Sequence, residues 1–287
     1  MGAALNRMLG HVEGALAARH ASEMQVRQFV ADASHELRTP LASIRGYAEL
    51  VRRSPQGVPP AALHAVGRVE AESVRMSALV EDLLLLARLD AGRPLAREEV
   101  DLAGLAVDAL ADAHAAGPDH RWFLDVPEDG AVVLGDAPRL HQVLANLLSN
   151  ARAHTPPGTT VEVRVRRERA WRGLPGSPAP LPTPGVLLEV HDDGPGIPEA
   201  LQPVLFQRFT RGDSARNRAG GSTGLGLAIA DAVVAAHHGV LGVRSEPGST
   251  TFTVWLPAVP PAPHPGAHAA DLDVDEPIPS PDVAPPA

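Results

Sequence analysis

Two apolar stripes with helical spacing dominate the N-terminal third of the chain and constrain its fold more than any other feature. In the first stripe, apolar residues recur every three or four positions from Val26 to Val51. The second runs from Val69 to Ala87, and the breaker-rich segment 54–60 (SPQGVPP) separates the two. This pattern predicts two long amphipathic helices joined by a turn. Because their apolar faces are too wide to leave in water, we expect two such hairpins to pair as a four-helix bundle.

The periodicity changes after about residue 98. Short strand-like runs (WFLDV, AVVLG, TTVEVRVRRE, GVLLEVHDD, TTFTVWLP) alternate with two helical ones (PRLHQVLANLLSNARAH, TGLGLAIADAVVAAHHG). This alternation predicts an α/β or α+β domain over residues 98–258. Residues 168–185, rich in Gly and Pro, read as a flexible insertion between two strands. Residues 259–287 are rich in Pro, Ala and Asp, and we expect a disordered tail.

Composition excludes several kinds of chemistry. The chain has no Cys, which excludes disulfides, thiolate metal sites and cysteine nucleophiles. It also has no Lys, so a P-loop and a Ser/Thr/Tyr protein kinase site are excluded as they are usually built. A net charge of -9 without a strong basic block argues against nucleic-acid binding. No run of about 18 apolar residues occurs, so the sequence predicts no membrane span.

The segment SHELRTP places a histidine and a proline within the first helical stripe. His35 is two residues from Ala33, which turns it away from the stripe and towards solvent. Pro40 costs about 3 kcal/mol in a helix interior, so it indicates a local bend. Glu36 can orient the ring of His35, and Thr39 lies on the same face as Glu36. The pattern indicates an exposed nucleophile with an adjacent base; a plain surface histidine is the alternative.

The second half of the chain carries an asparagine pair and an Asp-Gly turn. Asn146 and Asn150 are four residues apart on one helical face, where amide oxygens can hold a cation such as Mg²⁺. Asp192 ends a predicted strand and can accept a hydrogen bond from an exocyclic amine such as that of adenine. Gly194 and Gly196 permit a tight turn and a close ligand approach. Surface amides and an ordinary turn are the alternatives.

A polar segment rich in Arg and Gly, residues 207–223, precedes the last predicted helix. Gly224 and Gly226 open that helix, where backbone amides can bind phosphate. Arg208 and Arg211 are candidates to reach a γ-phosphate. A single glycine-rich turn is weak support for a nucleotide site, but the order of the motifs strengthens it.

Taken together, residues 22–257 resemble the catalytic core of a bacterial two-component sensor histidine kinase. ASHELRTPL resembles its phospho-acceptor box, NLLSNA its asparagine box and DDGPGIP its first glycine box. LFQRF resembles the phenylalanine box, TGLGLA the second glycine box and GSTTFTVWLP the closing strand. The resemblance implies a dimeric helical hairpin followed by an ATP-binding domain of the gyrase, Hsp90, histidine kinase and MutL type, an α/β sandwich with a mixed sheet.

The resemblance also implies roles for single residues. His35 is then the phospho-acceptor, Glu36 its catalytic carboxylate, and Thr39 part of the motif that dephosphorylates the partner. Arg211 matches the arginine near the γ-phosphate. The residues expected to bind Mg²⁺-ATP, the first two of them also the metal, are Asn150, Asn146, Asp192, Gly194, Gly196, Thr223, Gly224 and Gly226. The implied reaction is autophosphorylation of His35, transfer to an Asp of a cognate response regulator, and phosphatase activity on that regulator.

One pair of residues departs from the family pattern. Many members carry Lys then Tyr where this chain has Ala153 and His154, which puts a charge contact and nucleotide stacking in doubt. Residues 1–24 resemble the end of a HAMP-type signal helix, before a phosphotransfer hairpin over residues 25–92. We therefore expect a missing N-terminal sensor region that anchors a cytoplasmic catalytic region to the bacterial inner membrane. A soluble kinase is the alternative.

Two other functions remain open from the sequence. An ATPase of the same fold that drives a conformational clamp would need neither His35 nor the hairpin. A dimeric interaction module with a decayed nucleotide site, acting only as a phosphatase, would not bind ATP with Mg²⁺.

Overall fold

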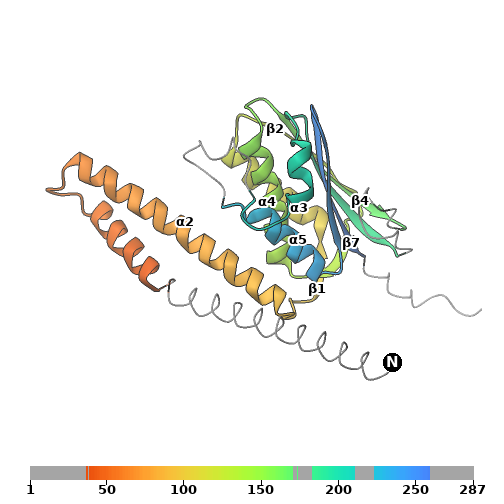
Figure 1. Ribbon diagram of the computed structural model, residues 1–287, viewed down its shortest axis with the longest axis horizontal. Coiled ribbons are helices and arrows are strands. Elements are labelled where there is room, and N and C mark those ends of the chain that lie inside the picture. The colour runs from red at the N-terminus through yellow and green to blue at the C-terminus, as the bar shows by residue number, and fades with distance from the viewer. Residues whose placement is uncertain (1–36, 38, 171–172, 174–182, 211–222, 259–287) are drawn as a thin grey trace, which may run out of the picture.

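The computed structural model describes residues 37, 39–170, 173, 183–210 and 223–258. A helical hairpin lies beside an α/β domain whose helices stack on one face of a sheet (Figure 1). The two-part architecture predicted from the sequence is confirmed. Three of the predicted site residues, His35, Glu36 and Arg211, lie outside the described residues.

The hairpin consists of a helix over residues 39–53, a turn, and α2 (Pro60–Asp90). α2 starts with a proline in its first turn, where the missing N–H costs nothing. It ends before Gly92, whose φ of 67° stops the helix. Leu41, Val80 and Leu84 form a small buried cluster between the two helices. Other apolar side chains of the hairpin remain exposed, among them Leu37, Ile44, Tyr47, Leu50, Val69, Val74 and Met76.

A five-stranded mixed sheet forms the centre of the α/β domain, with strand order β2-β4-β5-β7-β6. The strands are β2 (Arg121–Asp125), β4 (Thr160–Glu168), β5 (Gly185–Asp192), β6 (Val240–Glu246) and β7 (Ser249–Pro257). β2 pairs parallel with β4, and the remaining pairs are antiparallel. The β4–β5 pairing extends to Glu168 opposite Gly185. The predicted insertion is therefore the connection between two paired strand ends.

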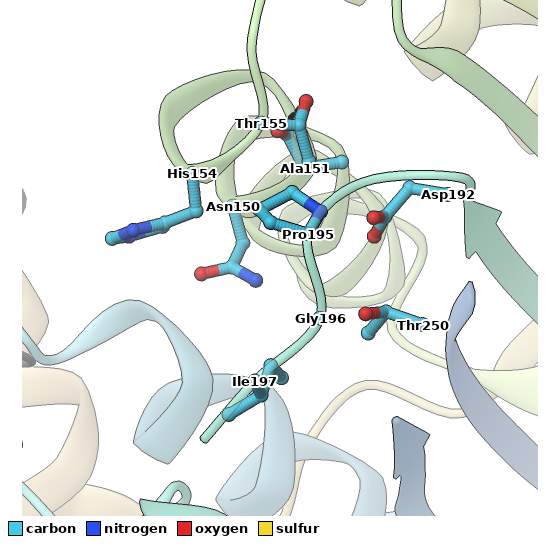
Figure 2. Close-up of a pocket in the computed structure, with 9 residues that line it drawn as sticks. All are labelled: Asn150, Ala151, His154, Thr155, Asp192, Pro195, Gly196, Ile197 and Thr250. Atoms are coloured by element: carbon cyan, nitrogen blue, oxygen red, sulfur yellow. Dashed lines mark hydrogen bonds between the residues drawn. The ribbon is translucent and has the colours of Figure 1, made fainter. Parts of the chain in front are cut away.

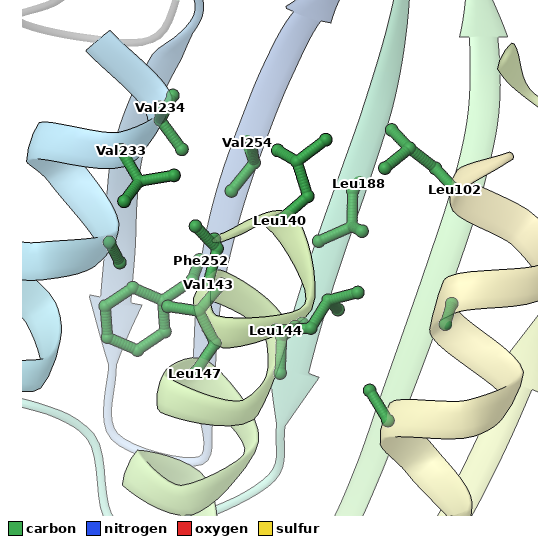
Figure 3. Packing of buried hydrophobic residues seen from close by; sticks show 14 of the residues in the cluster. Leu102, Leu140, Val143, Leu144, Leu147, Leu188, Val233, Val234, Phe252 and Val254 are labelled. Atoms are coloured by element: carbon green, nitrogen blue, oxygen red, sulfur yellow. The ribbon is translucent and has the colours of Figure 1, made fainter. Parts of the chain in front are cut away.

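Three helices pack on one face of this sheet: α3 (Leu102–Ala116), α4 (Ala137–His154) and α5 (Gly226–Ala236). Their apolar sides meet the inward side chains of the strands (Figure 3). Leu147 and Ile229 are fully buried there, as Phe252 nearly is. The smaller elements are a second sheet of β1 (Glu98–Asp101) and β3 (Val132–Gly135) and the 3₁₀ helix η1 (Glu199–Val204).

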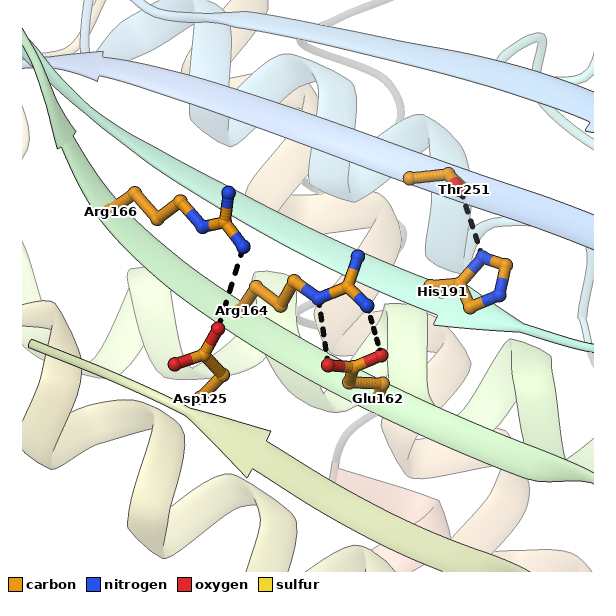
Figure 4. A network of polar contacts seen from close by, with 6 residues as sticks. All are labelled: Asp125, Glu162, Arg164, Arg166, His191 and Thr251. Atoms are coloured by element: carbon orange, nitrogen blue, oxygen red, sulfur yellow. Dashed lines mark hydrogen bonds and ion pairs between the residues drawn. The ribbon is translucent and has the colours of Figure 1, made fainter.

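The opposite face of the five-stranded sheet carries paired polar side chains (Figure 4). Arg166 contacts Asp125 at 3.5 Å across neighbouring strands, and Arg164 pairs with Glu162 on its own strand. His191 Nδ1 lies 3.0 Å from the Thr251 hydroxyl. One apolar and one polar face are what a two-layer sandwich requires.

The hairpin joins the α/β domain through the last turns of α2. Leu85 and Leu86 belong to the buried core of the domain. Beside them, Asp82 Oδ1 accepts a hydrogen bond from Gln142 Nε2 of α4 at 3.3 Å. In the described part of the chain, no helix is long and apolar enough to cross a membrane.

Candidate functional site

A pocket lies where the end of α4, the end of β5 and the start of β7 converge (Figure 2). Its walls carry three of the predicted site residues: Asn150, Asp192 and Gly196. The remaining lining residues are Ala151, His154, Thr155, Pro195, Ile197 and Thr250. The structure thus brings together the asparagine motif and the Asp-Gly turn, which are far apart in the sequence.

The asparagine pair lies on one face of α4, as the spacing predicts. Asn150 points into the pocket (Figure 2). Asn146, one turn earlier, donates from Nδ2 to the carbonyl of Gly226 at 2.9 Å. Asn146 therefore contacts the first residue of α5. Its amide oxygen also lies beside Gly226, 3.4 Å from where a Cβ of that residue would be. The pair connects the pocket with the glycine-rich helix start.

Asp192 is a buried carboxylate at the end of β5, only 4% exposed. Burial raises its pKa, while a hydrogen bond from the Gly194 amide, at 3.0 Å, lowers it. Thr250 lies opposite Asp192 in the β5–β7 register and also lines the pocket. A buried acceptor beside a hydroxyl suits recognition of a hydrogen-bond donor on a ligand.

The two glycines of the turn have different reasons to be glycine. Gly196 has a φ of 83°, and a Cβ there would lie 2.6 Å from the Glu246 carbonyl oxygen. Gly194 packs against Thr155, whose methyl carbon would be 2.5 Å from an added Cβ. Neighbouring protein atoms therefore leave no space for a Cβ at either position, and the close approach of a ligand stays a prediction.

The second glycine motif, which includes Gly224 and Gly226, lies directly before and at the start of α5. Gly224 has a φ of 71°, and its carbonyl accepts a hydrogen bond from the Phe209 amide at 2.9 Å. The Thr223 hydroxyl accepts from the Leu225 amide at 3.3 Å, just before α5 begins at Gly226. None of these residues lines the pocket itself; they lie at its α5 side, through the contact between Asn146 and Gly226.

Arg208 lies elsewhere than the sequence led us to expect. Its guanidinium contacts Asp90 at the end of α2, at 2.5 Å, rather than the pocket. Thr39, the predicted site residue of the phospho-acceptor box that the structure describes, is exposed, and its carbonyl accepts from the Ser43 hydroxyl at 3.1 Å. Contact of Arg208 with a γ-phosphate therefore stays a prediction.

Sequence reasoning overlooked Thr155 and Thr250. Thr250 faces Asp192 only through the pairing of β5 with β7, which no local pattern reveals. Thr155 follows the asparagine helix directly, so its position after α4 was the available signal.

A metal ion bound in this pocket would have asparagine amide oxygens as its protein ligands. Among the described residues, no group of three or more His, Cys, Asp or Glu side chains could hold a metal ion. The amide oxygens of Asn150 and Asn146 fit a cation that keeps waters and binds together with phosphates, as Mg²⁺ does.

Comparison with known proteins agrees with this arrangement. Residues 25–92 match the family model of the His Kinase A (phospho-acceptor) domain. Residues 135–260 match that of the histidine kinase-, DNA gyrase B-, and HSP90-like ATPase. The second match contains the whole pocket.

Similar proteins carry the same two regions. The probable sensor histidine kinase TcrY of Mycobacterium tuberculosis is 59% identical over 257 residues, which cover 90% of this chain and 51% of TcrY. The sensor histidine kinase TrcS of the same organism is 46% identical over 259 residues, 90% of this chain and 49% of TrcS. The chain spans about half the length of these curated relatives.

A solved structure of full-length ShkA in complex with AMPPNP is similar over 80% of this chain and 45% of its own, with a TM-score of 0.62 and 27% identity. A phospho-acceptor hairpin, an ATPase domain of this type and relatives that share both place the chain in one family. It belongs to the sensor histidine kinases of two-component systems.

Proposed function

We propose that this chain is the catalytic part of a protein-histidine kinase that uses ATP to phosphorylate His35 and then donates the phosphoryl group to an Asp of a response regulator. The observation that carries the proposal is the pocket where Asn150, Asp192 and the glycine turn meet, in a chain that also has a phospho-acceptor region.

The pocket has the parts that adenine nucleotide binding needs. Asp192 accepts a hydrogen bond from the exocyclic amine, and Gly194 and Gly196 let the base approach the backbone. Asn150 and Asn146 hold Mg²⁺ together with the phosphates of ATP. The similar protein ShkA was solved in complex with AMPPNP, which supports nucleotide binding by this chain.

The phosphates extend towards the start of α5. Gly224 and Gly226 lie there without side chains of their own, and the Thr223 hydroxyl accepts a hydrogen bond from the Leu225 amide in the same turn. Backbone amides at a helix start favour bound phosphate. The glycine-rich motif and the asparagine pair thus serve one ligand.

Phosphoryl transfer then runs from ATP to a ring nitrogen of His35. The nitrogen forms a bond to the γ-phosphorus, the bond to the β-phosphate oxygen breaks, and ADP leaves. Glu36 orients the ring and takes the proton that the ring loses. Arg211 offsets charge on the transferred group, and Mg²⁺, when bound, neutralises the phosphates. Thr39 contributes to dephosphorylation of the regulator.

The hairpin serves as the dimerisation element. Its exposed apolar residues include Leu37 and Ile44, which belong to the stripe predicted from the sequence. Two copies that cover these stripes form a four-helix bundle. The cognate regulator approaches the same hairpin, and the longer protein reaches the membrane through a sensor region that precedes this catalytic part.

The decisive experiment is incubation with γ-labelled ATP and Mg²⁺, followed by acid or alkali treatment. Label that resists alkali and is lost in acid identifies phosphohistidine. His35→Gln should abolish it, whereas His64→Gln, at an exposed position on α2, should retain it. Labelling of His35→Gln would contradict the proposal.

Unlabelled protein is also informative. Phosphate released without labelling would favour the clamp ATPase, and failure to bind ATP with Mg²⁺ would favour a decayed module.

A further inference from the structure

A buried histidine outside the family motifs supports the pocket from behind. His120 directly precedes β2 and is 8% exposed. Its Nε2 lies 3.0 Å from the hydroxyl of Thr155, which lines the pocket. The mechanism described above makes no use of this histidine.

The hydrogen bonds of Thr155 fix the tautomer of this histidine. The Thr155 hydroxyl lies 2.8 Å from the carbonyl of Ala151, an atom that can only accept. The single hydroxyl hydrogen is therefore donated to Ala151, and Nε2–H of His120 must donate to Thr155. Nδ1 is buried, and no polar atom in the described part of the chain pairs with it.

Packing holds the imidazole in this position. Its ring centroid lies 5.7 Å from that of Trp122, at an interplanar angle of 38°. The indole of Trp122 is itself fixed by a 2.8 Å hydrogen bond to the Gly117 carbonyl. The ring can thus act as a rigid donor behind the pocket wall.

Thr155 transmits this support to the nucleotide side. With its hydroxyl turned towards His120 and Ala151, its methyl group faces Gly194, where a Cβ would come within 2.5 Å. The Gly194 amide in turn holds Oδ1 of Asp192 at 3.0 Å. Three contacts therefore connect the histidine with the carboxylate that recognises the base.

We infer that His120 is a positioning residue for nucleotide recognition: by fixing the rotamer of Thr155, it supports the glycine turn that orients Asp192. The inference rests on the proposed function, since it assigns Asp192 to the nucleobase. Without the histidine, the Thr155 hydroxyl keeps only its hydrogen bond to Ala151. Its rotamer is then held less firmly, and the glycine turn is less well supported by the methyl group.

The test is calorimetric titration of the 287-residue chain with Mg²⁺ and ADP, which binds without phosphoryl transfer. His120→Ala should weaken ADP binding by about 3- to 10-fold, the range expected for one lost hydrogen bond. It should also narrow the preference for ADP over GDP. His120→Gln, whose amide can donate from near the Nε2 position, should recover most of the affinity.

A double-mutant cycle with Thr155→Val separates positioning from general stability. If His120 acts through Thr155, the double variant binds ADP no more weakly than Thr155→Val alone. Unchanged affinity in His120→Ala, or effects that multiply, would overturn the inference.

Two controls keep the result interpretable. If His120→Ala does not fold, His120→Asn replaces it, because its amide mimics Nδ1 and cannot reach Thr155; wild-type affinity in His120→Asn would then overturn the inference. A wild-type chain that fails to bind ADP contradicts the proposed function instead.

Discussion

The hairpin and the ATP-binding domain use amphipathic helices to different ends. In the domain, Leu147 of α4 is fully buried against the sheet. In the described part of the hairpin, the predicted stripe leaves Leu37 47% and Ile44 43% exposed, and its Leu41 is buried in a small cluster with Val80 and Leu84. One region completes its core within a single chain, whereas the other offers an apolar surface that requires a partner.

The division between these regions falls inside one helix. α2 contributes Leu84 to the hairpin cluster, but Leu85 and Leu86 to the core of the ATP-binding domain. A movement of α2 at this point must therefore change the packing of both regions. Substitutions on either side of this division test how independent they are.

The largest effect is expected from a cavity in the complete core. Leu147→Ala should lower the free energy of unfolding by about 2–5 kcal/mol, because the surrounding helices and strands cannot collapse onto the gap. Leu50→Ala, the matched change at an exposed leucine of the hairpin, should change it by about 0.5 kcal/mol or less. Denaturant titration measures both, and similar losses would remove the contrast.

A charge on the exposed apolar stripe of the hairpin should weaken dimerisation instead of lowering the stability of the single chain. Ile44→Glu places a carboxylate in the exposed stripe and should weaken dimerisation by about a hundredfold, since the charge loses water without a partner. Light scattering across a concentration series reports the change. Ala42→Glu, on an exposed position outside the stripe, is the control, and equal weakening there would place the interface elsewhere.

The stability of the contact between α2 and α4, where Asp82 meets Gln142, should depend on pH. Burial, and secondly Glu81, raise the pKa of Asp82 to about 6, against the effect of Arg139 and the Gln142 hydrogen bond. An acid whose pKa is raised by folding stabilises the folded state fully at a pH below its pKa in the unfolded chain. This stabilisation is lost as the pH rises through the folded-state pKa of about 6. The free energy of unfolding should therefore fall between about pH 4 and pH 7 at this site.

Asp82→Asn keeps the acceptor for Gln142 and removes the charge. It should stabilise the chain at neutral pH by about 1 kcal/mol, after allowing for the partial exposure of the group, and flatten the profile. Asp108→Asn, at an exposed position of α3, should leave the profile unchanged. Unfolding measured across this pH range decides, and a wild-type slope in Asp82→Asn would refute the assignment.

The smallest effect is expected where α2 meets the polar segment. Asp90 and Arg208 form an exposed ion pair, with side chains 26% and 47% exposed. Asp90→Asn should cost between 0 and about 1 kcal/mol of stability, and less at high salt. A double-mutant cycle with Arg208→Gln measures the coupling, and a coupling well above this range would show a joint stronger than an ordinary surface pair.

Local patterns predicted most of the architecture. The two stripes gave the hairpin, and α4, β5 and α5 followed from periodicity and glycine placement. The short strand β1 and the helix α3 escaped notice, although Asp101 caps α3 through the Ala103 amide at 3.1 Å. A four-residue strand such as β1 depends on the core it joins rather than on its own pattern, whereas the Asp101 cap was an available signal for the 15-residue α3.

The site was predicted where its chemistry is local and missed where it arises from folding. Asn150, Asp192 and Gly196 meet as the motifs indicated. Thr250 enters the site through strand register, and Arg208 is drawn to Asp90 of a different region. Neither contact can be inferred from residues close together in the sequence.

The pairing of β4 with β5 has a practical consequence for engineering. Glu168 and Gly185 are held opposite each other by the sheet, so the two ends of the connection lie close together whatever its length. The entropy of closing a loop grows only logarithmically with its length, so each doubling costs about 0.6 kcal/mol. A fluorescent reporter inserted between these strand ends should therefore be tolerated with little loss of stability.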